Sequence, residues 1–388
     1  DAYMLHVTTT PSVSYVTRQD EFDCGIMITA SHNPKQWNAL KLLNENGEFL
    51  NDAQGKEVLR LATNDEYKYA NVERLGRVYT NTTYARHHIN KILDLDLVDV
   101  NAIKKANFTV AVDAVNSIGG VIIPELLHKL GVENVIELYC APTGNFGHTP
   151  EPVPENLTDI STLMKEGKAD VGFVVDPDVD RLALVSEDGT MFGEEYTLVA
   201  VADYILSQGV GNTVSNLSSS RALSDVTKAY GGEYSASAVG EVNVVTKMKE
   251  VGAVIGGEGN GGVIYPALHY GRDALVGVAL FLTHLVKKNC TMTELRATYP
   301  AYYASKNKIQ LTPEIDVDKV LLEMKVCYAG ENVNDIDGVK IDFAENWVHL
   351  RKSNTEPIIR IYTEAKSADE ADSLAEKFIA EISEICNL

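Results

Sequence analysis

The stretch Gly25-Ile-Met-Ile-Thr-Ala-Ser-His-Asn-Pro34 is an apolar run that breaks into a short polar loop. The run is short enough for a buried strand, and Asn33-Pro34 favours a turn, so we expect Ser31 at the carboxyl end of a strand. In open α/β sheets that edge is where ligands bind. The alternative is that Ser31 caps a following helix, a position that serine favours.

Length and composition limit the class of protein. A chain of 388 residues with 45% hydrophobic residues can bury several cores, and its length allows about two to four domains. The net charge of −21 argues against nucleic acid or an anionic membrane as partner. The five cysteines are far apart and form no CxxC pair, and no apolar run reaches the ~20 residues of a membrane span. We expect reduced thiols and a cytoplasmic location.

Alternating apolar and amphipathic stretches divide the chain into successive units. Phe108-Thr-Val-Ala-Val-Asp113 is followed by a polar loop and an apolar helical stretch, which is the strand-loop-helix step of an α/β unit. This alternation recurs up to Lys287, whereas the last part favours strands and a helix with one apolar face. We predict the α/β class, with three successive α/β domains with mixed sheets plus a C-terminal α+β domain around a central cleft. The expected domains are 1–97, 98–190, 191–299 and 300–388.

The loop Asp176-Pro-Asp-Val-Asp-Arg181 presents three carboxylates at alternate positions after an apolar strand. Mg²⁺ suits such a loop, because it takes few carboxylates and completes its coordination with water or phosphate oxygens. With Glu187, the same aspartates also match the ligand spacing of an EF-hand calcium loop. We favour Mg²⁺, because Arg181 stands where that calcium loop needs glycine and because both flanks are predicted to be strands.

Two further loops carry polar groups. The glycine-rich stretch 253–262 is typical of a tight turn or a nucleotide loop, but Glu258 and Asn260 on it also suit the recognition of hydroxyl groups. The stretch Arg351-Lys-Ser-Asn-Thr-Glu-Pro357, with Arg360, is either a hairpin turn with solvated charges or an oxyanion site. Guanidinium groups, small hydroxyls and free loop amides favour the second interpretation.

Together these loops resemble those of the α-D-phosphohexomutases, which move a phosphate between the 1 and 6 positions of a sugar. Thr29-Ala-Ser-His-Asn-Pro34 is similar to the family's active-site serine loop, and the other three loops resemble its metal, sugar-binding and phosphate-binding loops in the same order. Asn260 replaces the family's usual serine, and Gly262 stands where its histidine would be. The family's first domain also opens with a further strand and a Gly-Ile-Arg-Gly loop that are absent here, so we expect an incomplete first domain.

The resemblance implies a role for each matching residue. Ser31 is carried as phosphoserine, and Lys41, otherwise a surface charge, is the implied general base with a pKa lowered by Arg181 and the metal. Arg272 and Lys247 fall near secondary phosphate or sugar contacts. The implied catalytic residues are Ser31, His32, Lys41 and Arg181; the metal ligands are Ser31, Asp176, Asp178 and Asp180; and the substrate-binding residues are Glu258, Asn260, Arg351, Ser353, Asn354, Thr355 and Arg360.

The expected activity is interconversion of hexose 6-phosphate and hexose 1-phosphate, with Mg²⁺ as cofactor and a sugar bisphosphate as activator. Phosphoglucosamine mutase activity is predicted, because Glu258-Gly-Asn-Gly resembles the loops of amino-sugar members. The alternative is phosphoglucomutase/phosphomannomutase activity. A phosphatase would share Ser31 and the metal but would have no use for a distal phosphate site. A non-catalytic metal-binding protein would keep the aspartates but tolerate loss of Ser31.

Overall fold

The computed structural model describes the chain except residues 35, 313–314, 354–357 and 387–388. The first helix of the N-terminal region is α1 (Thr10–Gln19), which Thr9 caps by accepting a hydrogen bond from the backbone of Ser12. After it, β2 (Gly25–Ile28) pairs antiparallel with β3 (Leu40–Leu43), so the Ser31 loop joins two strands. No helix begins among the described residues of this loop, so the alternative that Ser31 caps a following helix is wrong.

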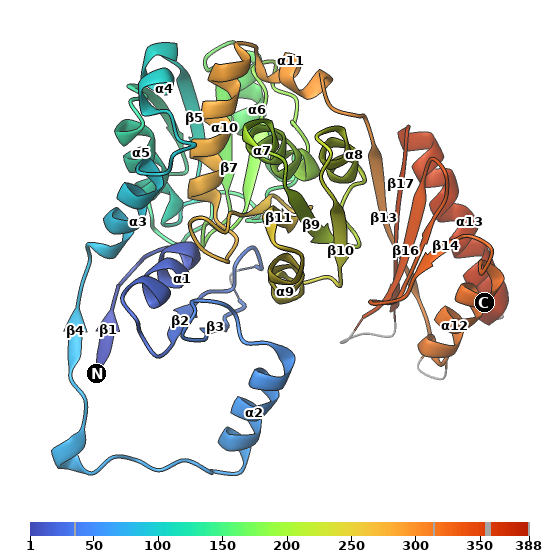
Figure 1. Cartoon of the computed structure of the whole chain (residues 1–388), viewed down its shortest axis with the longest axis horizontal. Coiled ribbons are helices and arrows are strands. Elements are labelled where there is room, and N and C mark those ends of the chain that lie inside the picture. Colours follow the sequence, from blue (N-terminus) through green and yellow to red (C-terminus); the bar gives the residue numbers. More distant parts are fainter. Residues whose placement is uncertain (35, 313–314, 354–357, 387–388) are drawn as a thin grey trace.

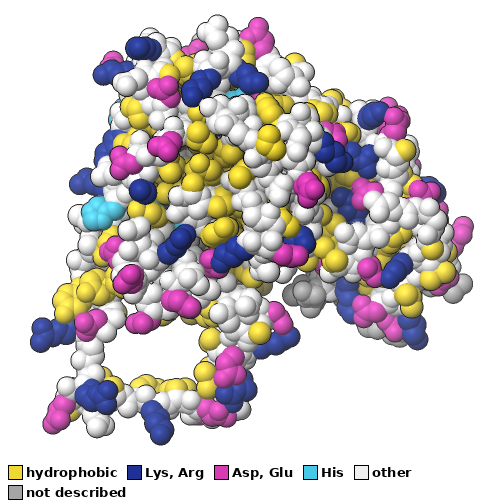
Figure 2. Space-filling view, viewed as in Figure 1, with side chains coloured by type: hydrophobic (Ala, Val, Ile, Leu, Met, Phe, Trp, Pro, Cys, Tyr) yellow, Lys and Arg dark blue, Asp and Glu magenta, His cyan; other side chains and the backbone are white. Residues whose placement is uncertain are grey.

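The segment between β3 and Asp96 contains few regular elements. Only α2 (Asp52–Thr63) and α3 (Tyr84–Leu93) are α-helices there, with a short 3-10 turn, η1 (Val72–Arg74), between them. Val78–Thr80 forms β4, which pairs with β1 (Ala2–Met4) in parallel, because β-branched and aromatic residues suit a strand once a partner edge is available. None of the residues of α2 is buried, and the segment forms an arm that encloses an opening between itself and the rest of the molecule (Figures 1 and 2).

The second and third regions share one plan. Their sheets have the strand orders β6-β5-β7-β8 and β10-β9-β11-β12, each with three parallel strands and one antiparallel edge strand. The mixed sheets that the sequence predicts are confirmed. The strands are β5 (Thr109–Asp113), β6 (Asn134–Leu138), β7 (Val171–Val175), β8 (Leu182–Val185), β9 (Asn212–Asn216), β10 (Tyr234–Ser237), β11 (Ala253–Glu258) and β12 (Gly262–Ile264).

This shared plan positions the two polar loops. The aspartate loop turns from β7 into β8, and the glycine-rich loop turns from β11 into β12, so each loop leads into the antiparallel edge strand of its sheet. The sequence does not predict β12, because a glycine-rich strand carries little apolar pattern. Helices flank both sheets (Figure 1): α4 (Val100–Ala106), α5 (Gly119–Lys129), α6 (Thr158–Lys165), α7 (Glu194–Gln208), α8 (Ala222–Ala229), α9 (Glu241–Val251), α10 (Ala274–Lys288) and α11 (Met292–Ala297), with a 3-10 turn η2 (Pro154–Asn156).

One hydrophobic core joins the first three regions. It runs from Tyr15 on α1 to Tyr299 beyond α11, and α10 lies inside it with twelve of its residues buried. A helix that is apolar all round must be covered on every side, and α10 contacts α3, α4 and α7. The loops of these three regions are therefore fixed to one packed body.

The C-terminal region has its own core and an antiparallel sheet of order β13-β17-β16-β15-β14. The amphipathic last helix that the sequence predicts, α13 (Ala368–Cys386), packs on β17 and β13. The remaining elements are α12 (Val317–Cys327) and the strands β13 (Tyr303–Gln310), β14 (Asn332–Asn334), β15 (Val339–Asp342), β16 (Trp347–Lys352) and β17 (Ile358–Ala365). Among the described residues, no helix is long and apolar enough to cross a membrane.

Candidate active site

Ser31 lies three residues beyond the end of β2 and meets the aspartate loop. Its Oγ donates a hydrogen bond to Asp176 Oδ2 at 2.9 Å and lies 3.3 Å from His32 Nδ1. The backbone of Ser31 is left-handed, with φ +50°, a conformation that few residues other than glycine adopt and that tends to occur at functional sites. The fold therefore exposes the Ser31 hydroxyl beside a carboxylate that lies 145 positions away in the sequence.

The three aspartates form one buried cluster. One carboxylate oxygen from each of Asp176, Asp178 and Asp180 lies within 4.8 Å of the others. The loop is closed on itself, because Asp176 Oδ1 accepts hydrogen bonds from the backbone N–H groups of Asp180 and Arg181, both at 3.1 Å. Val179 has φ +64°, which is unusual for a β-branched residue and shows that the surrounding structure dictates the loop conformation.

The cluster has the chemistry of a metal site. Burial, followed by the charges of Asp180 and Asp178, raises the pKa of Asp176 well above its usual range. The Oδ1 atoms of Asp178 and Asp180 are buried without a hydrogen-bond partner among the described residues. Buried carboxylate oxygens are costly when unpaired, and hard cations bind to such oxygens. The residues present therefore fit a divalent cation.

Lys41 reaches the cluster from β3. Its Nζ lies 2.6 Å from Asp178 Oδ2 and 2.8 Å from Asp180 Oδ2, with 19% of the side chain exposed, so it is not a surface charge. Burial alone would lower the pKa of Lys41, but the charges of Asp180 and Asp178 outweigh it and raise the pKa. This direction is opposite to the expected lowering, because the nearest side-chain charges to Lys41 are carboxylates rather than cations.

Arg181 lies beside the serine loop. Its Nη2 is 3.5 Å from His32 Nε2. Burial is the main cause of a lowered pKa at His32, and the charge of Arg181 adds to it. His32 therefore lies between the Ser31 hydroxyl on one side and a guanidinium on the other.

The glycine-rich loop packs directly on the strand that follows the aspartates. The backbone N–H of Leu182 donates to the carbonyl of Gly261 at 3.0 Å. Gly261 has φ +83°, and a Cβ there would lie 2.4 Å from the carbonyl oxygen of Leu182, so this close approach requires glycine. Asn260 on the same loop is half-buried, and its Oδ1 has no hydrogen-bond partner among the described residues.

Glu258 is buried and fully hydrogen-bonded. Its Oε1 accepts from Asn216 Nδ2 at 3.0 Å and from the backbone of Gly240 at 3.2 Å, and its Oε2 accepts from Arg272 Nη1 at 2.9 Å. Because Arg272 already pairs with this carboxylate, Glu258 offers less charge to a cationic sugar group than the sequence alone suggests.

Arg272 joins the aspartate and glycine-rich loops, a role that the sequence does not reveal. It makes ion pairs with Asp180 at 2.8 Å, Glu241 at 2.8 Å and Glu258 at 2.9 Å. Burial raises the pKa of Glu241 to about 7, although Arg272 opposes it. A Cβ on Gly262 would lie 2.3 Å from Arg272 Cδ. The space where the family resemblance leads us to expect a histidine is thus filled by the Arg272 side chain. Glu241 carries no sequence signal that distinguishes it from other acidic helix starts.

Arg351 and Arg360 lie on a separate sheet, that of the C-terminal region. Arg351 on β16 is directly opposite Arg360 on β17, and Arg351 Nε lies 3.0 Å from Asp337 Oδ2. Ser353 is buried, and its backbone N–H donates to the carbonyl of Ile358. Asn354 and Thr355 lie outside the described residues. Lys247 is also separate, since it pairs with Glu250 on the same helix.

The EF-hand alternative is wrong for this loop. Glu187, the acidic residue it needs, accepts hydrogen bonds from Thr293 and from the backbone of Met292 at the start of α11. The flanks of the aspartate loop are the strands β7 and β8, whereas an EF-hand loop joins two helices.

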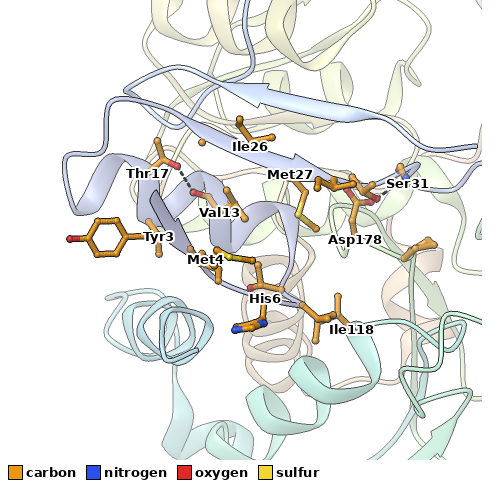
Figure 3. A pocket seen from close by; sticks show the side chains of 18 of the residues that line it. Tyr3, Met4, His6, Val13, Thr17, Ile26, Met27, Ser31, Ile118 and Asp178 are labelled. Carbon is orange, nitrogen blue, oxygen red and sulfur yellow. Dashed lines mark hydrogen bonds between the residues drawn. The ribbon is translucent and has the colours of Figure 1, made fainter. Parts of the chain in front are cut away.

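A cavity of about 780 Å³ opens beside the Ser31 loop, between β1, α1 and β2 (Figure 3). Apolar side chains such as Met4, Val13 and Met27 make up much of its wall, and Ser31 and Asp178 lie at one end. An apolar wall of this kind does not match a charged, hydroxyl-rich ligand. The polar groups of the site converge instead on the aspartate loop.

The chain is similar to known proteins over most of its length. The sequence matches family models described as phosphoglucomutase/phosphomannomutase alpha/beta/alpha domain I at residues 1–69, domain II at 86–189, domain III at 193–302 and the C-terminal domain at 289–381. It is 32% identical to a probable phosphoglucosamine mutase of Methanopyrus kandleri, covering 98% of this chain and 83% of the relative.

Two further matches agree. A phosphoglucomutase/phosphomannomutase of Thermococcus kodakarensis is 34% identical, covering 96% of this chain and 81% of the relative. The crystal structure of a phosphoglucomutase/phosphomannomutase family protein from Burkholderia thailandensis superposes with a TM-score of 0.86, covering 100% of this chain and 83% of that one at 23% identity, which supports the fold. The chain belongs to the phosphoglucomutase/phosphomannomutase family, the α-D-phosphohexomutases, and is an isomerase of that family.

Proposed function

We propose that this enzyme interconverts hexose 6-phosphate and hexose 1-phosphate through phosphorylated Ser31. The bond between phosphorus and Ser31 Oγ breaks as a bond to a sugar hydroxyl oxygen forms, and that hydroxyl loses its proton to a nearby base. The bisphosphorylated sugar reorients, and its other phosphate returns to Ser31 Oγ. The observation that carries this proposal is the Ser31 hydroxyl, 2.9 Å from a carboxylate oxygen of the aspartate cluster.

Three side chains around Ser31 complete the proposed chemistry. His32 is the first candidate for the group that takes the proton, because its Nδ1 lies 3.3 Å from Ser31 Oγ. Lys41 is protonated while it pairs with Asp178 and Asp180, so it is a candidate base only if a bound ion displaces it from those carboxylates. Arg181, next to His32, offsets negative charge on the transferring phosphoryl group. In the proposed domain division, the serine, aspartate, glycine-rich and C-terminal loops each come from a different domain and together surround one substrate.

We propose Mg²⁺ as the ion held by Ser31, Asp176, Asp178 and Asp180. When bound, it would neutralise charge on the phosphoryl oxygens. The support is that, among the described residues, two carboxylate oxygens of the cluster have no hydrogen-bond partner and carboxyl groups outnumber cations. In that part of the chain the cations that meet the acidic residues of the site are Lys41, Arg181 and Arg272, against Asp176, Asp178, Asp180, Glu241 and Glu258.

We propose that Arg351 and Arg360, with Ser353, Asn354 and Thr355, hold the phosphate that is not reacting. Directly opposite residues on antiparallel strands have Cβ atoms about 4.5–5.5 Å apart, and like charges at that distance destabilise the sheet. Arg351 and Arg360 form such a pair. A phosphate dianion between two guanidinium groups would relieve this repulsion with charge-assisted hydrogen bonds.

Replacing Arg351 or Arg360 by methionine is expected to weaken binding of both substrate isomers. Loss of one charge-assisted contact costs about 1.5–3 kcal/mol, and both isomers are affected because each in turn places its distal phosphate here. KM for glucose 1-phosphate and for glucose 6-phosphate measures the effect, and Arg86→Met, at an exposed arginine on α3, is the control. Weaker binding of only one isomer would show that the two orientations do not share this site.

We propose glucosamine phosphate as the preferred sugar, ahead of glucose or mannose phosphate. The relative from Methanopyrus kandleri is named a probable phosphoglucosamine mutase. The half-buried Asn260 Oδ1 accepts no hydrogen bond from the described residues and could accept one from a 2-amino group. Since Glu258 is already paired with Arg272, the preference is assigned to Asn260.

The efficiency of turnover, kcat/KM, is expected to be highest for glucosamine phosphate, by about fivefold, which corresponds to roughly 1 kcal/mol for one partly solvated polar contact. One preparation is compared with glucosamine, glucose and mannose phosphates. Asn260→Ser should bring kcat/KM for glucosamine phosphate closer to that for glucose phosphate, while the turnover of glucose phosphate changes little. A clear preference for glucose or mannose 1-phosphate would overturn the amino-sugar assignment and leave the Ser31 mechanism intact.

A further inference from the structure

A third cation continues the line of Arg351 and Arg360 across the C-terminal sheet. Lys308 on β13 is directly opposite Arg360 on β17, which is in turn directly opposite Arg351 on β16. Opposite residues of antiparallel strands point to the same face of a sheet. Lys308, Arg360 and Arg351 therefore form a row on one face, which we call the basic row.

This face of the sheet is turned towards the third region. Residues at alternate positions of the same strands contact it: His349 Nδ1 lies 2.9 Å from Ser218 Oγ, Glu364 Oε1 accepts from the backbone of Arg221 at 3.0 Å, and Lys306 Nζ donates to Glu194 at 2.8 Å. The opposite face is apolar and is covered by α12 and α13. In Figure 1, β13 is the edge of the C-terminal sheet nearest the third region.

The basic row is unusual in such an acidic chain. Lys308 and Arg360 are exposed, and neither forms an ion pair with an acidic residue in the part of the chain that the structure describes. By contrast, Lys306, two residues before Lys308 on the same face, is paired with Glu194. Three cations in direct cross-strand contact repel one another, although the net charge of −21 leaves acidic residues in excess. The arrangement favours an anionic ligand over an internal partner.

Asp337 holds the inner end of the row in place. It makes an ion pair with Arg351, and its Oδ2 also accepts a hydrogen bond from the backbone of Val239 in the third region at 2.9 Å. The next residue, Gly240, donates to Glu258 in the glycine-rich loop. The basic row is thus tied, through two short contacts, to the loop that we propose to bind the sugar.

We propose that Lys308 is a further substrate-binding residue, which contacts the distal phosphate of the hexose phosphate together with Arg360. This inference rests on the proposed function, in which Arg351 and Arg360 hold that phosphate. Lys308 is exposed, whereas Arg351 is partly buried, so the contact of Lys308 is more screened by solvent than that of Arg351. It is a binding rather than a catalytic residue, because it acts on the phosphate that does not react.

The test compares Lys308→Met and Lys308→Arg with the wild-type enzyme at low and high salt. Lys308→Met is expected to raise KM for glucose 1-phosphate and Ki for inorganic phosphate by about threefold to tenfold. The increase in KM and Ki should be smaller at high salt, because the contact is exposed and salt screens it. The value of kcat should be nearly unchanged, because Lys308 binds the substrate equally in the ground state and the transition state. Lys308→Arg should retain most of the affinity. Lys308 is exposed, so thermal unfolding should be unaffected.

Two variants separate this inference from the proposed function. Lys352→Met removes a cation next to Arg351 whose Nζ instead pairs with Asp318 of α12 at 2.7 Å, and it should leave KM and Ki unchanged. Equal increases of KM and Ki in Lys352→Met and Lys308→Met would show that only the net charge of the region matters. That result would overturn the inference. Unchanged binding in Lys308→Met with weakened binding in Arg360→Met would also overturn it, while the proposed arginine site stands. If Arg360→Met binds normally too, the proposed arginine site fails as well.

Discussion

Ser31→Ala is expected to lower mutase turnover by about 10⁴-fold or more, the scale on which loss of a covalent nucleophile acts. The hydroxyl of Ser31 is proposed to carry the phosphate, and it lies 2.9 Å from Asp176 Oδ2 of the aspartate cluster. Substrate binding should change far less, because the groups proposed to hold the sugar and distal phosphate lie on other loops. Conversion of glucose 1-phosphate to glucose 6-phosphate, followed in a coupled assay, gives the turnover.

The same variant tests where the phosphate is carried. Wild-type protein incubated with glucose 1,6-bisphosphate should gain one phosphate, located by peptide mapping in the Ser31 loop, and Ser31→Ala should gain none. Ser305→Ala, on β13 and hydrogen-bonded to Asp372, is the matched control and should behave as wild type. Full turnover in Ser31→Ala, or a phosphate mapped to another residue, would refute the phosphoserine mechanism.

Asn replacement of Asp176, Asp178 or Asp180 is expected to reduce kcat by about 10²-fold or more, with a smaller effect on KM. A bound divalent ion contributes several kcal/mol of charge stabilisation in the transition state, and each 1.36 kcal/mol corresponds to tenfold in rate. Treatment of the wild-type enzyme with a chelator should have a similar effect, which Mg²⁺ should reverse. Activity that survives complete removal of divalent cations would exclude the ion from the reaction.

These variants need a measurement that is independent of turnover, because Asp178 and Asp180 also pair with Lys41 and Arg272. A ligand that binds only the folded state stabilises it by about 2.7 kcal/mol at a hundred times its Kd. Mg²⁺ should therefore raise the unfolding temperature of the wild type and not that of the Asp178→Asn or Asp180→Asn variants. Asp188→Asn, in the exposed turn after β8, should keep the wild-type response.

Patterns confined to a few consecutive residues are sufficient to predict several strands, loops and helices of this protein. The apolar run before Asp176 and the polar loop after it predict β7 and the aspartate loop, because burial of a strand and exposure of a turn depend on local residue type. The amphipathic face of α13 is equally local. The sequence does not predict the arm around α2 or the strand β12. Each depends on a partner strand or on backbone packing rather than on its own residue pattern.

The sequence by itself determined the family, the order of the loops and the residue types that each loop presents. Only the tertiary structure decided which charges face each other. Lys41 is 137 positions from Asp178, and Arg272 is 92 positions from Asp180, so no local pattern indicates that these cations hold the aspartates or that the pKa of Lys41 is raised. Likewise, the alignment of Lys308, Arg360 and Arg351 depends on strand register. Register is set by how the sheet packs on α12 and α13, and charge interactions depend on distance in space rather than along the chain.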